Sequence, residues 1–291
     1  MSTSTGSGRG THRMLAAAGP PPAPGPDGAA PGYDPRRTQV ALGLLVLLPF
    51  LLAAAFLVGG DDGESDSGAP ALVDLATSGA GNFTLFTLFA SAGFLLVVVV
   101  ALFAGDAVAS EASWSSLRYL LAAPVDRARL LRSKLAAALV SCAAALVLLP
   151  ATAYVVGGVV WGFDPVRSPV GGAFTQGESL ARIGGVVAYL ALTLLFTASL
   201  AFLLSVLTDA PLGAVGGAVL LVIVSSVLDA VTALGDLRNA LPTHYSFAWT
   251  DLLLPTVSYD EMARGVLWTL GYSAVLLAVA FRRFGRKDIV S

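Results

Sequence analysis

Asp229 is the residue whose position in this sequence most suggests chemistry, because it is a carboxylate within a long apolar run. The run extends over Leu212–Leu234. A carboxylate inside a membrane-spanning segment marks a functional site by default. Two interpretations of Asp229 stay open: a role in transport or gating, and a hydrogen-bonded structural role near the outer end of the run.

The other reactive side chains do not form the pattern of a catalytic or metal site. The two histidines, His12 and His244, are far apart in the chain, and the single cysteine, Cys142, lies in an apolar run. Zinc sites need closely spaced Cys and His ligands, which are absent here. No Gly-x-x-x-x-Gly-Lys-Ser/Thr phosphate loop occurs either. The sequence therefore predicts no catalytic residue, metal or cofactor in this chain.

The composition is that of a membrane protein. Hydrophobic residues make up 56% of the 291 residues, charged residues 12%, and the mean hydropathy is +0.78. Soluble domains carry about 25% charged residues, so this chain has too little polar surface to cover a water-soluble fold. The net charge of −2 gives no indication of a nucleic-acid partner.

A bilayer core requires about 20 apolar residues in helical form, and the sequence contains several runs of that length. The predicted spans are Val40–Val58, Phe83–Phe103, Leu135–Val156, Val186–Leu207, Leu212–Leu234 and Gly265–Phe281. Strands would need an apolar–polar alternation that these runs lack, and backbone groups in lipid must be satisfied internally. We therefore expect an all-α integral membrane protein with six transmembrane helices.

The sequence divides into a tail and a membrane domain. Residues 1–37 are rich in Pro, Gly and Ser and have no apolar periodicity, which predicts a disordered tail. Residues 38–291 then form the six-span domain. Of the 17 Lys and Arg residues, 13 fall in the two tails and in the loop between spans two and three. By the positive-inside rule, both termini and that loop lie on the cytoplasmic side of the cell membrane.

The loop between the second and third spans, Gly105–Lys134, carries the most informative pattern. Leu117, Leu120 and Leu121 share one helical face, and Pro124 ends that helix. The pattern predicts a short amphipathic cytoplasmic helix. A helix that only anchors the chain to lipid headgroups would show the same pattern, so that interpretation also stays open.

The same loop resembles the signature of type-2 ABC transporter permeases. Members of that family have a Glu, a Gly-Thr pair, a Leu pair, a Pro-Val-x-Arg run, and an apolar pair before Gly-Lys. The matching residues are Glu111, Leu120, Leu121, Pro124, Val125, Arg127, Leu130, Leu131 and Lys134. Ser115 and Ser116 stand where Gly-Thr is usual, and Ser133 stands where Gly is usual. The segment Leu241–Leu252 resembles the short outer helices that precede the last span in this family.

The resemblance implies a function and its partners. In this family the loop docks as a coupling helix on a separate ATPase subunit, which binds the ATP. Leu120 and Leu121 would fill a groove of that subunit, while Arg118 and Arg127 would face its carboxylates. The resemblance therefore implies a permease subunit, not itself an enzyme, that works as a homodimer or heterodimer and mostly in export.

Two other function classes remain as alternatives. An ion-coupled secondary transporter would have several charges at the middle of the membrane and broken helices in repeated halves. Asp229 is the one candidate charge of that kind in the predicted spans. An intramembrane enzyme would need convergent reactive groups at depth, and both histidines lie outside the predicted spans.

Overall fold

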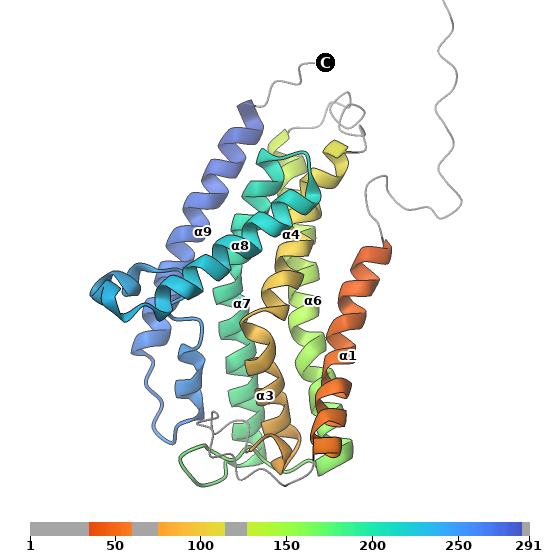
Figure 1. Ribbon diagram of the computed structural model, residues 1–291, viewed down its shortest axis with the longest axis vertical. Helices are drawn as coiled ribbons and strands as arrows, with labels where there is room; N and C mark the ends of the chain where they lie inside the picture. Colours follow the sequence, from red (N-terminus) through yellow and green to blue (C-terminus); the bar gives the residue numbers. More distant parts are fainter. Residues whose placement is uncertain (1–34, 60–74, 114–126, 287–291) are drawn as a thin grey trace, which may run out of the picture. The chain divides into compact units, whose positions relative to one another are not determined.

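The computed structural model describes residues 35–59, 75–113 and 127–286. Within these ranges the chain is helical and contains no strand, only an isolated bridge between Arg167 and Ala173. In chain order the elements are α1 (Pro35–Gly59), η1 (Ala76–Ser78), α3 (Ala80–Ala92), α4 (Leu95–Ser113), α6 (Arg127–Trp161), α7 (Gln176–Leu207), α8 (Pro211–Ala230), η2 (Thr232–Ala240), η3 (Ala248–Leu253) and α9 (Asp260–Arg286). The predicted all-α fold is confirmed (Figure 1).

The number of membrane spans depends on one bent pair of helices. Five helices of the described residues, α1, α6, α7, α8 and α9, are long and apolar enough to cross a membrane. Helices α3 and α4 pass the same test only together, and they meet at an angle of 60°. The described chain thus has five candidate spans, or six if the bent pair counts as one. This is the helical content of a multi-pass membrane protein.

Most helices are longer than the apolar runs that predicted them. Helix α6 begins eight residues before the predicted span, at Arg127, and α7 begins ten residues before its span, at Gln176. The start of α7 is fixed by a capping box, in which the Thr175 hydroxyl accepts from the Glu178 amide and the Glu178 carboxylate accepts from the Thr175 amide. Such caps satisfy orphan amides at a helix start and add stability.

The fifth span ends earlier than the sequence predicts. Helix α8 stops at Ala230, and the 3₁₀ helix η2 follows from Thr232. Val231 between them has extended backbone angles, φ −82° and ψ 96°. Apolarity alone predicted a continuous helix to Leu234, because Val231 and Leu234 are as apolar as the residues before them.

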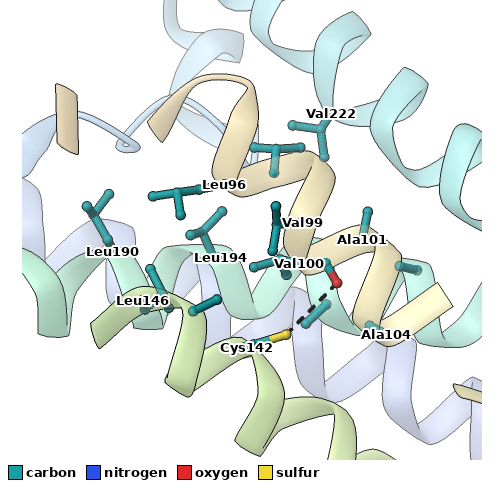
Figure 2. Packing of buried hydrophobic residues seen from close by; sticks show 14 of the residues in the cluster. Leu96, Val99, Val100, Ala101, Ala104, Cys142, Leu146, Leu190, Leu194 and Val222 are labelled. Carbon is teal, nitrogen blue, oxygen red and sulfur yellow. Dashed lines mark hydrogen bonds between the residues drawn. The ribbon is translucent and has the colours of Figure 1, made fainter. Parts of the chain in front are cut away.

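Helix α7 is the central element of the bundle. In its most apolar stretch 67% of the residues are buried, against 33% or less for α1, α6, α8 and α9. It packs against α4, α8 and α9. Leu190 and Leu194 of α7 lie in the main core, where they meet side chains of α4 and α6 (Figure 2). The thiol of Cys142 lies in the same core, 3.9 Å from the carbonyl oxygen of Val100.

A serine of α7 holds α4 by two backbone hydrogen bonds. The amides of Val108 and Ala109 both donate to Oγ of Ser205, at 3.0 and 2.9 Å. Ser205 is 1% exposed, so water cannot replace it as the acceptor. A second serine of the same helix, Ser199, is equally buried, but its hydroxyl has no hydrogen-bond partner.

These two serines give a matched pair for mutation. Replacing Ser205 with Ala leaves two buried amides without their acceptor, so we expect it to destabilise the fold by about 1–3 kcal/mol. Replacing Ser199 with Ala removes an unpaired hydroxyl and is expected to leave stability unchanged or to raise it. Thermal unfolding of both variants in detergent measures the difference, and equal melting temperatures would contradict this account of the α4–α7 contact.

Candidate functional site

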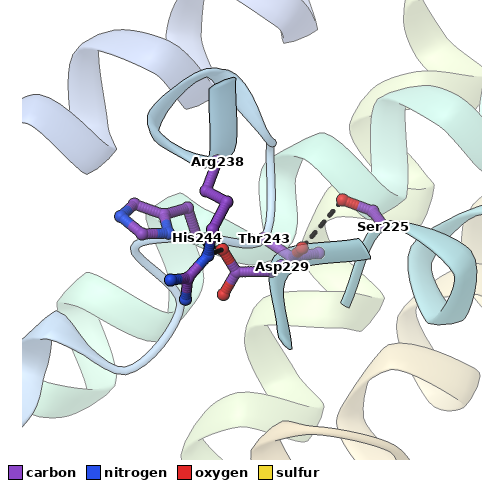
Figure 3. Close-up of polar contacts among 5 residues, drawn as sticks. All are labelled: Ser225, Asp229, Arg238, Thr243 and His244. Atoms are coloured by element: carbon purple, nitrogen blue, oxygen red, sulfur yellow. Dashed lines mark hydrogen bonds and ion pairs between the residues drawn. The ribbon is translucent and has the colours of Figure 1, made fainter. Parts of the chain in front are cut away.

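Asp229 lies in the last turn of α8 and joins a polar cluster with Arg238 and His244 (Figure 3). Its Oδ1 lies 2.5 Å from Nδ1 of His244 and 3.6 Å from Nε of Arg238. The three side chains are 23–29% exposed. Asp229 thus has charged and hydrogen-bonding partners within the chain, which the sequence did not reveal.

The path of η2 brings Arg238 back onto the end of α8. Gly235, within η2, has a φ of +51°, a conformation that favours glycine over residues with a Cβ. The chain reverses there, and the Ala240 carbonyl then accepts a hydrogen bond of 2.5 Å from the hydroxyl of Tyr272 on α9. The segment is therefore attached both to α8 and to α9.

A second group of hydrogen bonds continues from the cluster toward α7. One turn before Asp229, the hydroxyl of Ser225 lies 2.7 Å from the hydroxyl of Thr243. The ring of His244 packs edge-on against Tyr245 at 4.7 Å. The Tyr245 carbonyl accepts from the hydroxyl of Tyr189 on α7 at 2.7 Å. These contacts fasten residues 243–245 to both α7 and α8.

The geometry of the cluster fits a structural ion pair better than a catalytic site. A catalytic triad would need a nucleophile hydrogen-bonded to the second ring nitrogen of His244. The described residues contain no such hydroxyl, because Thr243 pairs with Ser225 instead. They also contain no group of three or more His, Cys, Asp and Glu side chains that could hold a metal ion.

A separate apolar cavity lies between α1, α4 and the start of α8. Its volume is about 570 Å³, and its walls include Leu44 of α1, Val99 of α4 and Leu212 of α8. Asp106 on α4 is the charged residue among its lining. Leu44 and Leu212 are 50% and 84% exposed. The cavity thus combines a mostly apolar surface with one carboxylate, a combination suited to an amphipathic molecule.

Much of the predicted coupling segment lies outside the described residues. This applies to Arg118, Leu120, Leu121, Pro124 and Val125, whose docking role stays a prediction.

The ends of the coupling segment are described. Glu111 is in the last turn of α4, and Arg127 is the first residue of α6. Leu131 on α6 is 1% exposed and packs in the main core, with the half-buried Leu130 against it. Lys134 is half-buried one turn farther along α6. Leu131 therefore packs within this chain, and a docking role for these residues stays a prediction.

We expect the charge of Asp229 to contribute modestly to stability. Asp229→Asn keeps the shape of the side chain but removes its charge, so the ion pair with Arg238 is lost. Because the pair is partly exposed, the expected cost is about 1 kcal/mol, or a melting temperature lower by roughly 2–4 °C.

The control for this variant is Asp236→Asn. Asp236 is an exposed carboxylate on η2 with no hydrogen bond or ion pair to any described residue. Its replacement should leave the melting temperature unchanged. An equal effect of the two replacements would show that the Asp229 cluster does not hold the end of α8.

Comparison with known families gives a match over most of the chain. No curated protein and no solved structure matches this chain. A family model described as "Protein of unknown function (DUF2705)" matches residues 72–290, which include every described element from η1 to α9. On the basis of this match, the chain belongs to the DUF2705 family.

Proposed function

We propose that this chain is the membrane-spanning permease subunit of an ATP-driven exporter of the type-2 ABC class. A separate ATPase subunit hydrolyses the ATP. The observation that carries the proposal is the sequence pattern from Glu111 to Lys134. The description of the DUF2705 family assigns no function. The proposal therefore rests on this pattern and on the helices that flank it.

The fold supports a docking role for the segment between α4 and α6. Helices α4 and α6 pack against each other, and the predicted docking segment falls between the end of α4 at Ser113 and the start of α6 at Arg127. Arg129 and Arg132, in the first two turns of α6, are exposed. Arg282 and Arg283, near the end of α9, are exposed too. Exposed basic side chains at helix ends are typical of a cytoplasmic surface.

The apolar cavity between α1, α4 and α8 supports transport of a hydrophobic or amphipathic substrate. Among the described residues its lining is apolar except for Asp106. Apolar side chains of α1 and α8 around it are exposed, among them Val40 and Leu220 at 64% and 60%. These surfaces fit lipid or a second copy of the permease. We propose a dimer in the cell membrane with one ATPase chain for each permease chain.

One observation favours the alternative of an ion-coupled secondary transporter. Broken helices are a mark of such transporters, and the pair α3 and α4 is bent by 60° at Gly93 and Phe94. The described chain has one such break and not the pair in repeated halves that the alternative predicts. The ATP-driven function therefore remains the better supported proposal.

The topology of the proposal can be tested by cysteine labelling. In a Cys142→Ala background, Asp62→Cys should react with a membrane-impermeant maleimide added outside intact cells. Ser115→Cys should react only after the membrane is opened. This follows because 13 of the 17 basic residues lie on the side of Ser115. Labelling of residue 115 from outside would overturn the orientation.

The proposed docking role predicts that negative charges at positions 120 and 121 weaken binding of the ATPase subunit. Replacing Leu120 and Leu121 with Asp should weaken binding of the ATPase subunit more than tenfold, since a central anchor contributes about 2 kcal/mol or more. Co-purification of the ATPase from membranes measures this. Transport and transport-stimulated ATP hydrolysis should fall together, and membrane insertion should survive.

Leu237→Asp is the matched control for this experiment. Leu237 is 71% exposed on η2, on the opposite side of the membrane in the proposed topology. The ATPase should co-purify with this variant at the level of the unaltered protein. If the ATPase also co-purifies at the unaltered level with the variant that has Asp at positions 120 and 121, the segment is a lipid anchor and the docking role is wrong.

A further inference from the structure

Two neighbouring helices carry exposed arginine pairs at the same end of the bundle. Near the start of α6 the pair is Arg129 and Arg132, and near the end of α9 it is Arg282 and Arg283. Helices α6 and α9 contact each other, and Figure 1 shows the start of α6 and the end of α9 at one end of the bundle. None of the four guanidinium groups forms a hydrogen bond or an ion pair with a described residue.

The arginine pair on α6 continues an exposed apolar stripe of the same helix. Residues 129, 136, 140 and 147 recur at helical spacing and share one face with residue 132. Val140 and Val147 on this face are 68% and 61% exposed. In a membrane protein such a stripe faces lipid, so Arg129 and Arg132 point sideways into the bilayer surface and not only along the helix axis.

Helix α9 repeats this arrangement independently. Val275 and Val279 are exposed, and Arg282 and Arg283 follow Val279 at spacings of three and four residues, which places all four side chains on one face. Two helices that run in opposite directions thus each present valines in the span and an arginine pair at the same end of the bundle.

The distance from the apolar runs places the arginines at the level of lipid headgroups. Arg132 precedes Leu135, the first residue of the predicted span, by three residues, or about 4.5 Å of helix. Arg282 directly follows Phe281, the last residue of its span. The headgroup layer is about 5–8 Å thick on each side of the hydrocarbon core. Arginine side chains are long enough to keep their charged ends within this layer.

The start of α6 gives an additional electrostatic reason for an anion. A helix N-terminus carries a partial positive charge, which a carboxylate in the first turn usually offsets. The first turn of α6 contains no acidic residue, and Arg129 and Arg132 add positive charge there. An anion at this position is attracted by the helix dipole and by both guanidinium groups.

From this juxtaposition of exposed valine stripes and unpaired arginine pairs, we propose that α6 and α9 each bind an anionic phospholipid of the cytoplasmic leaflet. The lipid phosphate accepts hydrogen bonds from the guanidinium groups, whose planar shape suits two-point binding of phosphate. An acyl chain lies along the valines. Carboxylates of an ATPase subunit would meet the arginines from the end of the bundle and would leave the valine stripes unused, so the shared face favours lipid.

The experiment measures the melting temperature of the purified full chain in detergent with added lipid. Phosphatidylglycerol in large excess should raise the melting temperature by roughly 5 °C, because it binds only the folded chain. Phosphatidylcholine with the same acyl chains has no net charge and should raise it much less. Inorganic phosphate at equal ionic strength should have no effect, because it has no acyl chain. An equal rise with both lipids, or with inorganic phosphate, would contradict the proposal.

Two double variants test the assigned residues. Arg129→Gln with Arg132→Gln should remove about half of the rise caused by phosphatidylglycerol, and Arg282→Gln with Arg283→Gln should remove about half as well, since separate sites contribute additively. The matched control is Arg167→Gln with Arg264→Gln, which removes two exposed arginines on the opposite side of the membrane in the proposed topology. The control should keep the full rise.

A full rise in both double variants would place the bound lipid elsewhere and overturn the assignment. Loss of a co-purifying ATPase subunit from these variants, with the response to phosphatidylglycerol unchanged, would assign the arginines to that subunit and also overturn it. The comparison of lipids on the unaltered chain decides the proposal even if a variant does not fold. Binding in detergent requires no ATPase, so the result is separate from the fate of the ATP-driven function.

Discussion

The need to satisfy every backbone hydrogen bond within an apolar medium is the constraint on which this structure depends. It makes each long apolar run a helix, and it gives every interruption of a helix a cost that other groups must offset. The end of α8 at Ala230 is one such interruption, and the cluster of Asp229, Arg238 and His244 lies beside it.

Helix α7 is the most enclosed of the candidate spans and connects several elements of the bundle. Its Ser205 hydroxyl accepts from two amides of α4, and its Tyr189 hydroxyl donates to the carbonyl of Tyr245. Near its start, the guanidinium of Arg182 donates to the carbonyls of Leu252 and Leu254 and lies 3.8 Å over the ring of Phe174. A movement of α7 would therefore displace α4, α8 and the segment before α9 together.

The apolar runs of the sequence were sufficient to predict the helices, because burial in lipid depends on composition over about 20 residues. They could not predict the bend within Phe83–Phe103, since Gly93 and Phe94 are apolar themselves. Just before the bend, the hydroxyls of Thr87 and Ser91 donate to carbonyls of α3, a type of hydrogen bond that often bends helices slightly. The partners of Asp229 depend on the reversal of η2, which places Arg238 and His244 beside it through tertiary structure and not through helical spacing.

The most direct test of the ATP-driven function is the mass of the intact complex. Native mass spectrometry of the affinity-purified chain, released from mild detergent, determines which subunits travel together. Our account predicts two copies of this 29.6 kDa chain together with two copies of a nucleotide-binding chain that carries a phosphate loop. An assembly that contains this chain and no ATP-binding subunit, while still transporting substrate in vesicles with an ion gradient and no ATP, would contradict it.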